Sequence, residues 1–139
     1  MKKKRLDIEY TFDFELYGII STVKAYKLAW ELNHALGSKL VKVEDYEVQH
    51  KKKVVNYLHY AQIGEVNSLK LFKNKSNEEN GGRDFLVPEH PHFDFILLAH
   101  GEAFTDSNRL QELLRNIPSI ELVAFIPLAA LKTKEYFIF

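Results

Sequence analysis

In its second half the chain reads Phe95-Ile96-Leu97-Leu98-Ala99, and this stretch is apolar at every position. A strand that faces solvent on one side alternates apolar and polar residues, whereas a strand covered on both faces does not need to. The stretch therefore predicts a strand over residues 92–99 that is buried on both faces and lies in the centre of a sheet.

Two amphipathic helices are predicted, one before this strand in the sequence and one after it. The first spans residues 22–36 and ends at Gly37, a residue type that commonly terminates helices. The second begins at Thr105 or Asp106, either of which can cap a helix, and ends at Pro118. Each carries an apolar stripe that can pack on a sheet: Ala25, Leu28, Ala29, Leu32, Ala35 and Leu36 in the first, and Leu110, Leu113, Leu114 and Ile117 in the second.

Five further segments have the alternation or the composition of strands. They are residues 6–14, 40–48, 54–61, 68–73 and 120–126. Gly18 breaks the pattern after the first, Glu44-Asp45 interrupts the second, and residues 51–53 and 64–67 are predicted to be hairpin connections. The order of elements predicts one α+β domain over residues 1–139, a two-layer sandwich of a mostly antiparallel sheet with two main helices on one face. A ferredoxin-like core with extra strands also fits this order. Residues 74–84 are polar and contain Gly81-Gly82, which predicts a mobile loop within the domain.

The composition restricts the classes of function. Nineteen basic residues balance nineteen acidic ones, so the chain lacks the basic excess that is typical of nucleic-acid-binding proteins. It contains no cysteine, which excludes disulfides and thiolate metal sites. No apolar run approaches the roughly 20 residues of a membrane helix. Because Asp7, Glu9 and Asp13 interrupt the N-terminal stretch, no secretory signal is expected there. We therefore expect a cytoplasmic protein with no membrane partner and no cofactor.

One segment is similar to a known family signature. The sequence Val87-Pro88-Glu89-His90-Pro91-His92-Phe93-Asp94-Phe95 resembles the motif of the IPExxxVDY family, small bacterial proteins without an assigned activity. Three more segments resemble the family in the same order along nearly the whole chain: FELYGI (14–19), YKLAW (26–30) and LFKN (71–74). Val87, Phe93 and Phe95 depart from the signature by replacing Ile, Val and Tyr. A family mechanism that used the tyrosine hydroxyl could not operate here, so the resemblance implies a bacterial origin and no particular chemistry.

The same segment holds the densest set of candidate metal ligands. On an extended backbone His90, His92 and Asp94 would point to one side, with about 7 Å between successive residues. Two imidazoles and a carboxylate could bind zinc or iron, which would make the protein a metal-dependent enzyme. Glu89 and Asp94 could instead form an acid–base pair. The structural alternative is a strand entrance at which Asp94 caps backbone amides.

Two groups of lysines lie beside aromatic residues, as on surfaces that stack the bases of single-stranded RNA. One comprises Lys70, Lys73 and Lys75 with Phe72, and the other Lys51, Lys52 and Lys53 with Tyr57 and Tyr60. The alternative is a solvated strand face and turn. A weak RNA-binding accessory protein is therefore a further hypothesis, although the neutral net charge does not favour nucleic acid as a partner.

The first helix carries more apolar surface than one sheet can cover. Val23, Tyr26 and Trp30 lie nearly opposite its main stripe. The chain ends in an apolar tail, which is Tyr136-Phe137-Ile138-Phe139. Either the tail folds back over this helix face, or both form a contact surface. Because the chain also lacks a P-loop and a nucleophile elbow, our leading hypothesis is a non-catalytic protein-interaction domain. We expect a homodimer, with an unidentified protein partner as the alternative.

Overall fold

The computed structural model describes residues 14–50, 53–64, 66–77, 84–101, 107–132 and 137. The predicted strand over residues 6–14 lies outside this part of the chain except for Phe14, and the apolar tail lies outside it except for Phe137. Among the described residues, no helix is long and apolar enough to cross a membrane. The elements are β1 (Phe14–Ser21), α2 (Ala25–Leu36), β2 (Val41–Lys42), β3 (Tyr46–His50), β4 (Lys53–Tyr57), β5 (His59–Ile63), β6 (Ser68–Lys73), β7 (Phe95–His100), α3 (Ser107–Arg115), β8 (Ile120–Ile126) and the 3-10 turn η2 (Leu128–Ala130).

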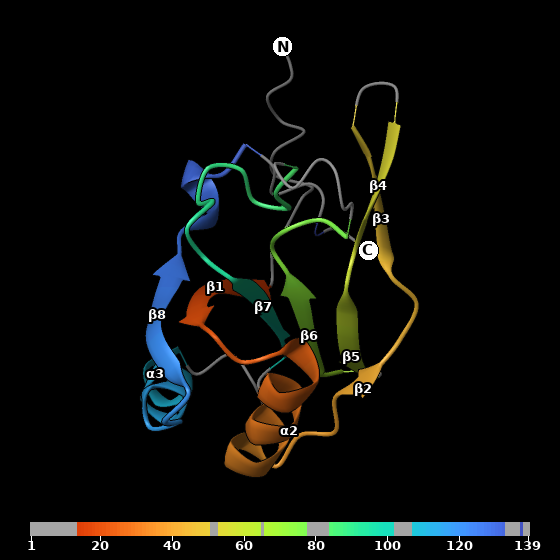
Figure 1. Cartoon of the computed structure of the whole chain (residues 1–139). Helices are drawn as coiled ribbons and strands as arrows, with labels where there is room; N and C mark the ends of the chain where they lie inside the picture. The colour runs from red at the N-terminus through yellow and green to blue at the C-terminus, as the bar shows by residue number, and fades with distance from the viewer. Residues whose placement is uncertain are drawn as a thin grey trace.

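Six strands form one antiparallel sheet in the order β2-β5-β6-β7-β1-β8, and β3 and β4 form a separate hairpin (Figure 1). β7 lies between β6 and β1, which confirms the predicted central strand, although it begins at Phe95 and not at residue 92. The order β6-β7-β1-β8 is that of a ferredoxin-like core, with α2 in the connection from β1 to β6 and α3 in that from β7 to β8. β5 and β2 extend the core at one edge.

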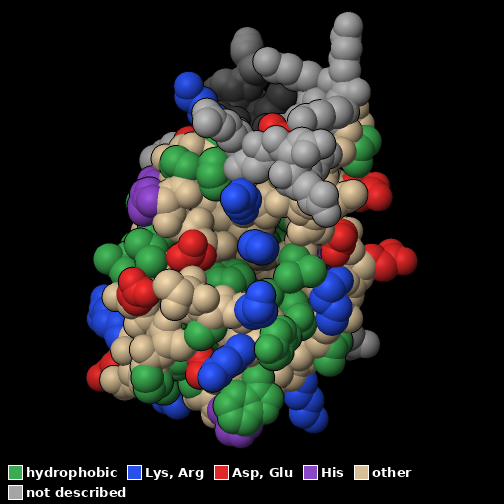
Figure 2. Space-filling model, viewed as in Figure 1, with side chains coloured by type: hydrophobic (Ala, Val, Ile, Leu, Met, Phe, Trp, Pro, Cys, Tyr) green, Lys and Arg blue, Asp and Glu red, His purple; other side chains and the backbone are tan. Residues whose placement is uncertain are grey.

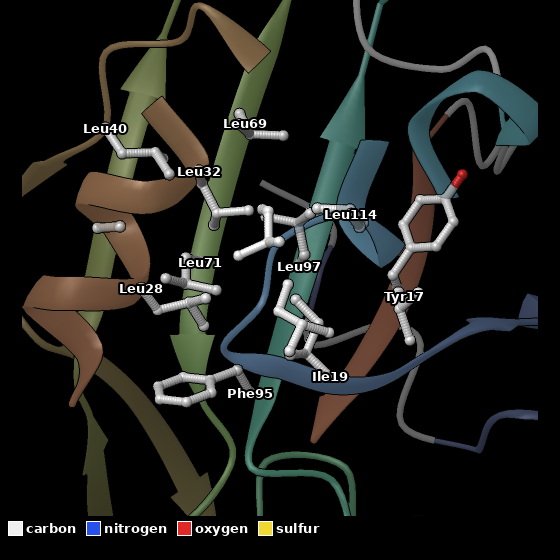
Figure 3. Packing of buried hydrophobic residues seen from close by; sticks show 14 of the residues in the cluster. Tyr17, Ile19, Leu28, Leu32, Leu40, Leu69, Leu71, Phe95, Leu97 and Leu114 are labelled. Atoms are coloured by element: carbon white, nitrogen blue, oxygen red, sulfur yellow. The ribbon is translucent and has the colours of Figure 1, made fainter. Parts of the chain in front are cut away.

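Both helices pack on the same face of the sheet, as predicted. Leu28 and Leu32 of α2 and Leu114 of α3 belong to one buried cluster (Figure 3). The sheet contributes alternate residues of its central strands to this cluster, among them Tyr17, Ile19, Leu69, Leu71 and Leu97. α2 begins at Ala25, three residues later than predicted, and ends at Gly37, whose φ of 68° is the left-handed conformation that glycine adopts without strain.

The opposite face of the sheet is covered by the β3–β4 hairpin, by Leu86, Val87 and Phe93, and by Leu131 and Phe137. A second buried cluster joins Leu16, Phe72, Ile96 and Leu98 of the sheet to Val48, Val55 and Tyr57 of the hairpin. The predicted interruption at Glu44-Asp45 separates β2 from β3, whereas the prediction of one strand over residues 54–61 is wrong. Leu58 separates β4 from β5, so that Tyr57 pairs within the hairpin while His59 pairs with Phe72 in the main sheet. Residues 40–48 and 54–61 each contribute one strand to the main sheet and one to the hairpin, which alternation alone does not reveal.

The sequence pattern suggested that a strand ends before Gly18, but Gly18 lies in the middle of β1. The residues before and after it continue the pairing with both β7 and β8. The Phe93 ring lies against the glycine backbone, where a Cβ atom would overlap it. The glycine therefore admits an aromatic ring to the sheet surface and does not interrupt the sheet.

Candidate functional site

Asn74 organises the segment that resembles the family signature. Its side chain is fully buried, and its Nδ2 donates hydrogen bonds to the carbonyl oxygens of His90 and Phe93, both at 3.0 Å. Its Oδ1 accepts a hydrogen bond from the Val87 amide at 2.8 Å. One amide side chain thus holds three points of the segment from Val87 to Phe93. Asn74, at the start of the predicted loop over residues 74–84, is part of the buried core, and residues 78–83 lie outside the described part.

The two carboxylates of the segment each bind a backbone amide. Asp94 Oδ2 accepts a hydrogen bond from the Ser21 amide at 2.9 Å, where β1 ends. Glu89 Oε2 accepts one from the Lys132 amide at 2.6 Å. These are the capping roles of the structural alternative. Each bond engages one carboxylate oxygen with a backbone amide, which accounts for both residues without a catalytic role.

The histidines of the segment do not form a ligand set with Asp94. The backbone is not extended here, because turns close between Val87 and His90 and between His90 and Phe93. The rings of His90 and His92 lie edge to face with their centroids 5.8 Å apart, and the His92 ring packs on Phe93 at 4.4 Å. Among the residues that the structure describes, no group of three His, Asp or Glu side chains is placed to hold a metal ion. The predicted grouping of His90, His92 and Asp94 is corrected accordingly.

The aromatic residues of the predicted RNA surface are largely internal. Phe72 and Tyr57 are fully buried and Lys70 is 8% exposed, so neither ring can stack on a base. Of this set Lys73 and Lys75 are exposed. Lys51 and Lys52, together with the side chain of Lys53, lie outside the described part. The alternation of β6 explains the error, since Phe72 faces the layer formed by the hairpin.

Beneath the hairpin lies a buried histidine that the sequence did not single out. The His59 ring stacks on Phe72 with centroids 4.5 Å apart, and its Nε2 has no hydrogen-bond partner among the described residues. Burial and the charge of Lys70 lower the pKa of His59 to about 4, against a smaller opposing effect of a hydrogen bond to the Glu44 backbone. Burial also lowers the pKa of Lys70. The histidine is consequently neutral at physiological pH.

The predicted contact surface is divided by the fold. Tyr26 and Trp30 are 65% and 58% exposed on α2, while Val23 precedes the helix and packs partly against the first cluster. Phe137 is 1% exposed and belongs to the second cluster, on the other side of the sheet. Its assignment to an exposed interface is therefore wrong. Tyr136, Ile138 and Phe139 lie outside the described residues.

A pocket of about 640 Å³ opens where α2 begins, beside the ends of β5 and β6. Its lining includes three lysines, Lys24, Lys73 and Lys75, of which Lys24 is the residue that precedes α2. Its apolar walls come from Tyr26, Tyr60, Phe85, Phe93 and Phe95. Sequence reasoning missed this pocket, because its residues come from five separate segments. Figure 2 shows Lys and Arg side chains gathered along the middle of this face of the molecule, with hydrophobic side chains beside them.

Comparison with protein-family models and with curated proteins gives no match to this chain. The functional argument therefore rests on the surfaces and the pocket described above.

Proposed function

We propose that this chain is a non-catalytic interaction domain that forms a homodimer through the exposed face of α2. The observation that carries the proposal is the exposure of Tyr26 and Trp30, two large aromatic side chains one turn apart. Large apolar side chains grouped on a surface are typical of binding sites, and Tyr and Trp are enriched at the centres of interfaces. Phe137 does not cover this face, since it is buried in the second cluster.

A second copy is the occupant that the helix itself suits. In an antiparallel pair of α2 helices related by a two-fold axis, the macrodipoles oppose each other. Lys27 lies in the first half of α2 and Glu31 in the second, so such a pair sets unlike charges at the same end, although Glu31 also accepts a hydrogen bond from the Ser119 hydroxyl. The ring of His34 already packs on Trp30 with centroids 4.0 Å apart, which holds the indole in place before association.

The size of this surface limits the strength of the dimer. A standard interface buries about 800 Å² per partner, and without Phe137 the twelve-residue helix offers less than that. We therefore expect a reversible dimer with a dissociation constant on the order of 10 μM, at the weak end of specific interfaces.

Sedimentation equilibrium between about 5 and 500 μM tests the proposal. The wild type should change from monomer to dimer over this range, and Trp30→Glu should stay monomeric with an unchanged circular dichroism spectrum. The control is Phe125→Glu, because Phe125 is a comparably exposed aromatic residue, 43% exposed, on β8. It should dimerise like the wild type. A wild type that is monomeric throughout, or a Trp30→Glu variant that dimerises equally well, would exclude this surface.

We propose two further assignments, the cellular location and the family of the protein. We propose a cytoplasmic location, with which the lack of cysteine agrees. Membership of the IPExxxVDY family is supported by the way Asn74 of the LFKN segment and Gly18 of the FELYGI segment both contact the signature segment. These contacts account for the segments as parts of one structural unit.

A further inference from the structure

We propose that the pocket at the start of α2 binds a small phosphorylated molecule that carries a flat ring, such as a nucleoside monophosphate. The pocket borders the proposed dimer surface and shares Tyr26 with it, whereas Trp30 does not line the pocket, so a substitution of Trp30 distinguishes the two proposals.

The charge of the pocket favours an anion. Lys24, Lys73 and Lys75 line it, and none of them makes an ion pair with a described residue. Asp94 is the only acidic residue among the described lining residues, and its Oδ2 already accepts the Ser21 amide hydrogen bond. Three cations against one carboxylate give the described lining of the pocket a net positive charge, which concentrates anions although the chain as a whole is neutral.

The walls of the pocket favour a ring. Tyr26 of α2 is exposed, and Tyr60 of β5 and Phe85 are partly exposed, whereas Phe93 is 5% exposed and presents little of its ring to the pocket. Aromatic side chains offer flat apolar surfaces on which another ring can stack. A lysine contacts phosphate as a point charge and does not demand one geometry, so the lysines attract the charged group while the aromatic walls select the molecule attached to it.

The volume agrees with a ligand of this class. Pockets for small molecules and cofactors measure about 300–1,000 Å³, and the volume of about 640 Å³ falls within that range. Inorganic phosphate alone would leave the apolar walls in contact with water, and a neutral ring would leave the lysines without a counter-ion. We therefore expect both parts of the ligand to be needed.

Isothermal titration calorimetry and ligand-observed NMR with the full chain test this inference, with AMP and phenyl phosphate as probes. We expect dissociation constants on the order of 0.1 mM at low salt, rising with ionic strength because the lysines contribute through charge. Adenosine and inorganic phosphate should each bind at least tenfold more weakly than AMP. Lys73→Glu should weaken AMP binding at least tenfold, whereas Lys39→Glu, the same change at an exposed lysine outside the pocket, should not.

Three results would overturn the inference. The first is an absence of binding by both phosphorylated probes at 1 mM. The second is an affinity for AMP that Lys73→Glu leaves unchanged while its fold is retained. The third is an affinity for inorganic phosphate equal to that for AMP, which would show that the aromatic walls contribute nothing. The Trp30→Glu variant should bind AMP as the wild type does, so failure of the dimer and failure of the pocket are separately visible.

Discussion

Trp30 and Phe137 lie on opposite sides of the six-stranded sheet, the first 58% exposed on α2 and the second 1% exposed in the cluster that includes Tyr57 of the hairpin. Two aromatic residues that look equivalent in the sequence thus have different energetic roles. Burial in the chain's own core stabilises the monomer, whereas exposure on a helix leaves a side chain free for a partner.

This separation predicts different costs for truncation. Phe137→Ala should lower the free energy of unfolding by about 3–5 kcal/mol, because it removes a buried aromatic ring that packs edge to face on Phe72. Trp30→Ala should change it by less than ~1 kcal/mol at concentrations where the protein is monomeric. Urea denaturation at about 1 μM measures both values. Equal costs for the two variants would show that the tail and the helix face form one structural unit after all.

Asn74 should be among the most sensitive polar positions of the chain. Asn74→Ala leaves the Val87 amide and the carbonyl oxygens of His90 and Phe93 without their partner inside the fold. Since each unsatisfied buried group costs ~1–3 kcal/mol, we expect a total loss of at least ~3 kcal/mol in the free energy of unfolding. Asn77→Ala is the matched control on the exposed side of the same segment and should cost less than ~1 kcal/mol. Similar losses of unfolding free energy in both variants would argue against the proposed importance of the three Asn74 hydrogen bonds.

Gly18 and Phe93 should show strong coupling. Gly18→Ala alone places a methyl group within the Phe93 ring and should destabilise the fold by about 2–4 kcal/mol, as overpacking does. Phe93→Leu alone loses apolar contact. Combined with Gly18→Ala it should cost at least ~1 kcal/mol less than the sum of the two single changes, because the smaller side chain relieves the overlap. A double-mutant cycle by thermal or urea unfolding measures the difference, and strict additivity would contradict the proposed contact.

His59 makes stability depend on pH. Its pKa is about 4 in the folded protein and about 6.5 when unfolded, so between these values the unfolded state binds more protons and stability rises with pH. The contribution is fully present above pH 6.5, and by pH 5 about 2 kcal/mol of it should be lost. Urea unfolding from pH 5 to pH 8 should reveal this slope. His59→Phe should flatten it, and His92→Gln, at an exposed histidine, should not; an unchanged slope in His59→Phe would assign the effect to other groups.

The sequence predicts the layers better than it predicts the surfaces. Phe95 to Ala99 identified the central strand, and the stripe containing Leu28 and Leu32 identified the packed helix face, because apolar periodicity reports directly on local burial. The separate layer of the hairpin was missed, since the apolar residues Val55 and Tyr57 are two positions apart whichever sheet they join. Alternation shows that one side of a strand is covered without showing which layer covers it.

The candidate sites depend on contacts between distant segments and were predicted less well. Asn74 lies in a polar stretch that reads as a loop, and its role appears only when the return of the chain at Val87 is known. His90 and His92 looked like ligands because an extended backbone was assumed, whereas Pro91 lies between two turns. The lysines of the pocket were partly visible in the sequence, but Lys24 and Lys73 are forty-nine positions apart.

The hydrogen bonds of Asn74 to Val87, His90 and Phe93 also make this part of the chain suitable for the insertion of foreign sequence. Lys75 pairs with Phe85 and Asn74 binds Val87, so the described residues on the two sides of residues 78–83 are held next to each other. The closure entropy of a loop grows only with the logarithm of its length, and doubling a loop costs about 0.6 kcal/mol. We therefore expect that a foreign sequence inserted between Asn77 and Asp84 would change the stability of the domain little, so that reporter peptides could be inserted at this position.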